Sequence, residues 1–108
     1  MDSKMDRTEN VHTLVAQSLR SRIMVTYALC AIADSDVYGG NWERAGQTVK
    51  AIRRLIAEID VLIFEQTGRI PASTIHEAGD LLAELENRTQ SIEESLRLSG
   101  PFMCRRPL

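Results

Sequence analysis

Apolar residues recur at alternating spacings of three and four along most of this 108-residue chain. Seven such positions in a row carry no charge in the central part of the sequence: Trp42, Ala45, Val49, Ile52, Ile56, Ile59 and Ile63. This spacing places all of them on one side of an α-helix over residues 42–67. A helix of roughly 26 residues is about 39 Å long. Because so long an apolar stripe must be buried, the pattern predicts partner helices of similar length.

Two flanking segments repeat the pattern and predict these partners. A helix over residues 7–38 has the core line Ala16, Leu19, Ile23, Thr26, Cys30, Ala33 and Val37. A helix over residues 74–98 has the line Ile75, Ala78, Leu82, Leu85, Thr89, Ile92 and Leu96. Helices joined by short links pack as antiparallel neighbours. We therefore predict one all-α domain over residues 1–108, an up-down-up bundle of three long helices with flexible tails at 1–6 and 100–108.

Turn and cap residues mark the predicted helix ends. Glycine adopts positive φ at little cost, so Gly39 and Gly68 are expected just after the first and second helices. Asn41 is expected to cap the second helix. Asp6 or Thr8 is expected to cap the first helix, and Thr74 with Glu77 forms a predicted capping box for the third.

Charge supports the antiparallel pairing of the last two helices. Basic residues in the first half of the second helix are expected beside acidic residues in the second half of the third. The basic residues are Arg44, Lys50, Arg53 and Arg54, and the acidic ones are Glu86, Glu93 and Glu94. Exposed pairs of this kind contribute only about 0 to 1 kcal/mol each, so they indicate direction more than stability.

Composition narrows the class of protein. Hydrophobic residues make up 44% and charged residues 26%, which is typical of a globular domain. The formal net charge of -2 argues against direct binding of nucleic acid. The first ten residues are polar and no apolar run is long enough for a bilayer, so we expect a cytoplasmic protein without a membrane segment. Cys30 and Cys104 are expected as free thiols, although both fall at the same predicted end of the bundle.

No catalytic, metal-binding or cofactor-binding motif is present, so we expect a non-enzymatic protein with no cofactor. His76 on a helix with Gly79 nearby is similar to a histidine phosphotransfer module, but such modules place a lysine before the glycine and add a fourth helix. Asp34 and Asp36 are interpreted as polar helix-end residues. A phosphotransfer-like module, or a structural bundle such as a secretion chaperone or phage accessory protein, remains an alternative.

The first helix has apolar residues on the side away from its core line: Met24, Val25, Ala28, Leu29 and Ile32. A helix that is apolar all round is normally buried all round, and a three-helix bundle covers only one side of each helix. These residues predict a protein interface, and a wide core stripe is the competing interpretation. A smaller group, Val61 and Phe64, lies off the stripe of the second helix. The sequence leaves open whether the first helix contacts a second copy or another partner.

The stretch GGNWERAGQTVKAIRRLIAEIDVLI, with its GG-x-W and AI-x-x-LI spacings, resembles the QslA-like family of small helical quorum-sensing antiactivators from pseudomonads. The resemblance covers most of the chain but includes no motif from which a functional residue can be transferred. It implies a homodimer that binds a LuxR-type transcription activator and blocks the dimerisation and DNA binding of that activator.

Overall fold

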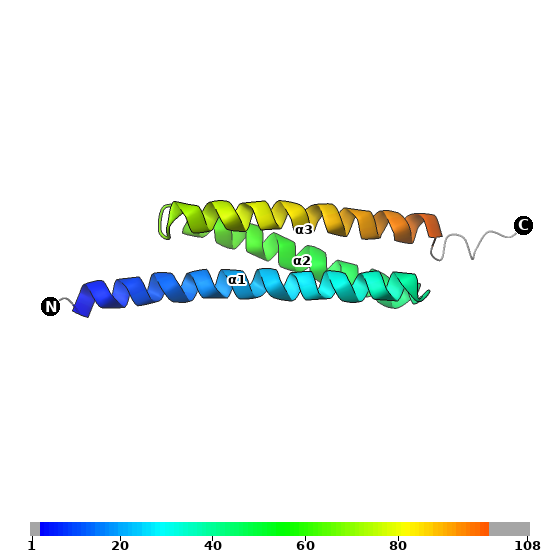
Figure 1. The fold of residues 1–108 in the computed structure, drawn as a ribbon, viewed down its shortest axis with the longest axis horizontal. Coiled ribbons are helices and arrows are strands. Elements are labelled where there is room, and N and C mark those ends of the chain that lie inside the picture. Colours follow the sequence, from blue (N-terminus) through cyan, green and yellow to red (C-terminus); the bar gives the residue numbers. More distant parts are fainter. Residues whose placement is uncertain (1–2, 100–108) are drawn as a thin grey trace, which may run out of the picture.

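Three helices form nearly the whole of the described structure, a computed structural model that describes residues 3–99. They are α1 (Ser3–Tyr38), α2 (Trp42–Gln66) and α3 (Ala72–Ser99). Consecutive helices run in opposite directions, and each helix packs against both of the others (Figure 1). No strand occurs among the described residues. The predicted all-α bundle of three antiparallel helices is therefore confirmed.

The core lies along the three predicted apolar lines. In α2, Ala45, Val49, Ile52, Ile56 and Ile59 are buried, and the end residues Trp42 and Ile63 are partly exposed. Leu19 of α1 and Leu85 of α3 are fully buried. Heptad spacing keeps each line facing the other two helices, because 3.5 residues per turn follow the supercoil of packed helices.

The helix α1 is longer than its partners, with 36 residues against 25 in α2 and 28 in α3. Its N-terminal part extends beyond the link between α2 and α3 (Figure 1). It begins at Ser3, so the segment expected to be a flexible start is helical from that residue, and neither Asp6 nor Thr8 is a cap. The predicted tail at 100–108 lies outside the described residues.

The link between α1 and α2 is tight. The backbone N–H of Gly39 donates to Ser35 O at 2.9 Å, and that of Asn41 donates to Asp36 O at 2.7 Å. The positive φ, +83°, is at Gly40 rather than at the predicted Gly39. Asn41 occupies the N-cap position as predicted, but its side chain makes no capping hydrogen bond.

The link between α2 and α3 is anchored by Ile70, which is buried in the core. Gly68 has a φ of +86°, as expected for the residue that turns the chain out of a helix. The helix α3 begins at Ala72, directly after Pro71, whose carbonyl accepts the N–H groups of Thr74 and Ile75 at 3.0 and 3.2 Å. The predicted capping box at Thr74 is therefore wrong, because Thr74 already lies in the first turn.

Ion pairs between helices agree with the antiparallel arrangement. Of the pairs expected between α2 and α3, the structure shows the one between Arg53 and Glu93, in which Nη2 of Arg53 lies 2.7 Å from Oε1 of Glu93. Arg44 instead faces α1, where its Nε lies 3.4 Å from Oδ2 of Asp36.

Among residues 3–99, no helix has an apolar stretch long enough to cross a bilayer.

Candidate protein-interaction surface

The outer surface of α1, defined here as Met24, Val25, Ala28 and Ile32, is exposed on the side opposite the core. Met24 is 71% exposed, Val25 53% and Ile32 44%. None of the four belongs to the buried core cluster or to the partly buried residues packed against it, whereas Leu19, Ile23 and Cys30 of the same helix do. Exposed apolar residues that gather on one face are typical of a site that binds another protein.

Leu29, the fifth residue predicted for this interface, is placed differently. It is only partly exposed and packs against the buried core cluster. A charge at position 29 would therefore disturb the bundle as well as any outer contact. The competing interpretation, a wide core stripe, holds for Leu29 but not for the other four residues.

On α2, the predicted pair Val61 and Phe64 is also exposed. Phe64 is 81% exposed and Val61 is 54% exposed. The two residues are three positions apart, which places them next to each other on the surface of the helix. They form a second, smaller apolar site.

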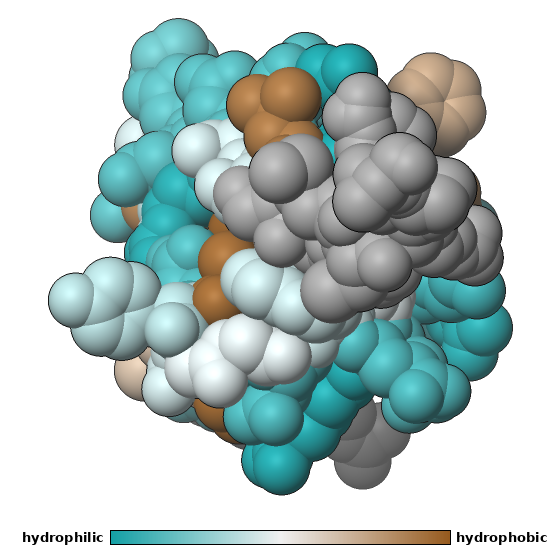
Figure 2. Space-filling model, turned by 90° about the vertical axis from the view of Figure 1, so that its right-hand side faces the viewer, coloured by the Kyte–Doolittle hydropathy of each residue, from teal (hydrophilic) through white to brown (hydrophobic). Residues whose placement is uncertain are grey.

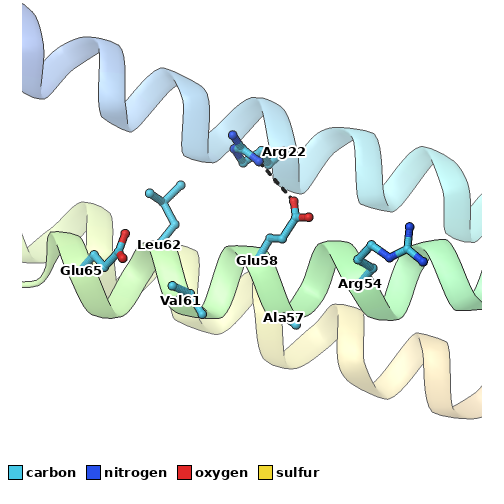
Figure 3. Close-up of a pocket in the computed structure, with 7 residues that line it drawn as sticks. All are labelled: Arg22, Arg54, Ala57, Glu58, Val61, Leu62 and Glu65. Atoms are coloured by element: carbon cyan, nitrogen blue, oxygen red, sulfur yellow. Dashed lines mark hydrogen bonds and ion pairs between the residues drawn. The ribbon is translucent and has the colours of Figure 1, made fainter.

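Val61 also borders a shallow open groove between α1 and α2, with a volume of about 530 Å³ (Figure 3). Arg22 comes from α1, and the six other lining residues come from α2: Arg54, Ala57, Glu58, Val61, Leu62 and Glu65. The guanidinium of Arg22 donates to Oε1 of Glu58 at 3.4 Å across the groove. Sequence reasoning missed this groove because it depends on which residues of α1 and α2 lie at the same level.

Exposed apolar residues continue toward the N-terminus of α1. Val11 and Leu14 are both largely exposed, although the sequence analysis did not assign them to the interface. Their spacing from Val25, 14 and 11 positions, is that of a heptad pattern, and this was the signal available in the sequence. The apolar side of α1 is therefore longer than predicted.

The end of the bundle where α1 joins α2 differs from the outer surface of α1 in how its hydrophobic side chains are distributed. On the part of this end not covered by grey atoms, hydrophobic side chains appear as separate spots among hydrophilic ones (Figure 2). The visible part of this end therefore shows no continuous apolar patch.

Residues with catalytic chemistry are dispersed. His76 is exposed on α3, and its Nε2 lies 3.7 Å from Oδ2 of the equally exposed Asp80. Among the described residues, no group of three or more histidine, cysteine or acidic side chains is placed to hold a metal ion.

Cys30 and Asp36 are buried polar groups with structural partners. The Sγ of Cys30 lies 3.9 Å from Oγ1 of Thr89, and burial raises the pKa of this thiol. Asp36, expected as a solvated helix-end residue, is instead buried against Arg44, at a distance suited to an ion pair but without hydrogen-bond geometry. Cys104 lies outside the described residues, so its expected relation to Cys30 is not tested.

Tyr27 and Asp34 of α1 form a cluster with Arg88 of α3 that joins the two helices. The guanidinium of Arg88 lies 5.7 Å from the centre of the Tyr27 ring and donates to Oδ2 of Asp34 at 3.3 Å. Burial, with a further contribution from Glu84, raises the pKa of Tyr27 to about 12. The phenol therefore stays neutral in the physiological range, and the cluster serves to pack the two helices.

Comparisons with known proteins gave no match. No family model, no curated protein and no solved structure is similar to this chain at a significant level.

Proposed function

We propose that this protein is a non-enzymatic regulator that binds another protein, and that its partner is a LuxR-type transcription activator. The observation that carries the proposal is the outer surface of α1, which stays exposed and uncharged while the opposite side of the same helix is buried. The choice of a LuxR-type partner follows from the resemblance of the α2 stretch to quorum-sensing antiactivators. The exposed apolar surface supports binding of another protein, and the resemblance supports the kind of partner and the regulatory role.

The mechanism would be competition for a surface. An activator that must dimerise to bind DNA exposes an apolar dimerisation surface while it is a monomer, and the outer surface of α1 would cover it. Burying apolar area supplies the free energy of such a contact, and polar residues at its edge provide specificity. Arg20 and Arg22 are exposed on the same part of α1, and Arg22 pairs with Glu58 of α2. These three charges would form the edge.

A homodimer is part of the proposal, because an apolar surface of this kind is also available to a second copy. Fully burying a large aliphatic side chain contributes about 1.5 to 3 kcal/mol. Val25, Ile32 and Met24 are already partly covered in the monomer, so burying the rest of them in two chains contributes roughly 5 to 10 kcal/mol. This value lies within the cost of association of roughly 4 to 15 kcal/mol.

The test is a DNA-binding assay with a LuxR-type activator from a pseudomonad and the operator that it recognises. Wild-type protein should release the activator from DNA in a concentration-dependent way. Ala28→Glu should lose this effect, because it places an unpaired carboxylate inside the contact. Ala83→Glu is the matched control, since Ala83 is also an exposed alanine within a helix but lies on α3.

Two results would contradict the proposal in different ways. If the wild-type protein leaves several such activators on DNA, the LuxR-type partner is wrong. If wild type and Ala28→Glu release the activator equally, the partner is right but the outer surface of α1 is not the binding site. Phe64→Ser would then test the smaller site on α2.

A further inference from the structure

A second heptad line runs along α1 on the side away from the core. Its eight residues follow one another at alternating spacings of three and four, and all of them are exposed and uncharged: Val11, Leu14, Ser18, Ser21, Val25, Ala28, Ile32 and Ser35. We call these residues the outer seam of α1. A helix with heptad lines on two sides is typical of one that packs against helices on both sides. Within the described residues, α2 and α3 cover only the inner line.

We propose that a second copy of the chain covers the outer seam with its own α1, and that the two helices lie antiparallel with their symmetry axis at residue 23. This inference rests on the self-association proposed above and specifies its geometry. The interface residues predicted from the sequence lie around Val25 and Ile32. The outer seam extends this contact to Val11, two heptads before Val25.

The charge of α1 favours the antiparallel direction. Its first part, up to Arg22, contains four basic and two acidic residues, and the remainder contains no basic one. The two acidic residues of the remainder, Asp34 and Asp36, already pair with Arg88 and Arg44 of the same chain. Antiparallel helices place the basic half of each chain beside a half without basic residues, whereas parallel helices would align the two basic halves. The helix dipoles also favour this direction.

The residues of the outer seam match each other in this register. Their midpoint is residue 23, so an antiparallel partner pairs all eight positions. The largest residues of the two halves, Ile32 and Leu14, face each other. Each serine faces an aliphatic residue: Ser18 faces Ala28, Ser21 faces Val25, and Ser35 faces Val11. Parallel pairing in register would instead place serine against serine in three layers, including two consecutive ones.

The edges of the outer seam are compatible with this pairing. Met24 and the exposed part of Leu29 lie beside it and extend the apolar strip. Arg22 also lies beside the seam, near the symmetry axis, and would come close to its counterpart in the second copy. Glu58 of the same chain, 3.4 Å from Arg22, offsets this repulsion.

Cysteine cross-linking of the full chain tests the arrangement. Cys104→Ser removes the native thiol that the structure does not describe, and Cys30 can remain because it is fully buried. Ser18→Cys is made in one sample and Ala28→Cys in another that carries a longer affinity tag, and the two are oxidised separately and after mixing. Tags of different length separate the mixed product from the two products of like chains.

In the antiparallel register, position 18 lies opposite position 28 of the second copy. Two copies of position 18 are then ten residues apart along the axis, or roughly 15 Å at 1.5 Å per residue. A disulfide needs Cα atoms within about 7 Å. We expect the mixed disulfide in at least tenfold excess over either disulfide between like chains. The Ala28→Cys and Ser18→Cys chains alone should stay largely uncross-linked.

Each of the other outcomes would overturn a different part of the proposed dimer. Efficient cross-linking of each variant with itself would mean parallel helices, and a dimer that forms none of these disulfides would mean a different interface. A monomeric mass for the wild-type chain in light scattering would overturn the self-association itself. None of these results depends on a transcription activator, so they are separate from failure of the DNA-release assay.

Discussion

Arg53 of α2 and Glu93 of α3 are joined by two hydrogen bonds across the interface between these helices. The Nε of Arg53 donates to Oε2 of Glu93 at 3.1 Å, and Nη2 donates to Oε1 at 2.7 Å. Both side chains are about 40% exposed, so water screens the interaction. The pair therefore agrees with the register that the buried core sets between α2 and α3, and it adds little free energy.

The pair makes stability depend on acid pH. Arg53 holds the pKa of Glu93 below its ordinary value of 4.5. The contribution of the pair to the free energy of unfolding is thus fully present above pH 4.5. It is lost as the pH falls through the lower pKa of Glu93 in the folded state. Glu93→Gln should reduce the free energy of unfolding by about 0 to 1 kcal/mol at pH 7. Denaturant melts at pH 7 and pH 3 should show a smaller acid loss for this variant than for wild type.

The control for that comparison is Glu77→Gln. Glu77 is exposed on α3 and has no ion-pair partner among the described residues. Its acid loss should equal that of wild type. An unchanged acid loss in Glu93→Gln would contradict the assigned role of the pair.

The core prediction concerns Ile56, which is 4% exposed in the middle of α2. Ile56→Ala should lower the free energy of unfolding by about 2 to 5 kcal/mol, because truncating a buried aliphatic residue leaves a cavity. Lys50→Ala on the exposed side of the same helix should cost little. Chemical denaturation followed by circular dichroism measures both, and small, equal losses would mean that the register of α2 is wrong.

Leu29 and Met24 should respond differently to the same charge. Leu29→Glu places a carboxylate against the core cluster and should destabilise the bundle by about 1 to 3 kcal/mol or more. Met24→Glu should leave the monomer as stable as wild type, because Met24 is exposed. Thermal melts at a concentration low enough to keep the chains monomeric measure the difference. Equal melting temperatures would show that Leu29 lies outside the core.

The thiol of Cys30 should be unreactive in the folded protein. It is fully buried, and burial raises its pKa, so the reactive thiolate is scarce near neutral pH. In a Cys104→Ser background, modification by a water-soluble thiol reagent should be slow and should accelerate with denaturant as the bundle opens. Rapid modification in native buffer would indicate that α1 separates easily from α3 near Thr89.

The periodicity of the sequence was sufficient to predict which side of each helix is buried. Leu19, Ile52 and Leu85 each stand in the middle of a heptad line, and spacing alone decides that such residues face inward. Proline and glycine gave the helix ends to within a few residues, because Pro71 permits a helix to start but not to continue through it.

The remaining features depend on how the helices lie against each other. Leu29 and Asp36 sit at the edge of the core line of α1, and only the position of α2 decides that Leu29 contacts the core and that Asp36 is buried beside Arg44. Ile70 lies in a link, where no periodicity applies. The groove at Arg22 and Glu58 likewise needs the relative level of two helices. The interface residues on α1 and α2 remain predictions.

The central claim is that the outer surface of α1 binds a protein partner. Its most direct test is the dissociation constant for a LuxR-type activator, measured by calorimetry or fluorescence titration, for Ala28→Glu and for Ala83→Glu. We predict that Ala83→Glu binds as wild type does and that Ala28→Glu binds at least tenfold more weakly, which corresponds to about 1.4 kcal/mol. Equal dissociation constants for the two variants would contradict the claim.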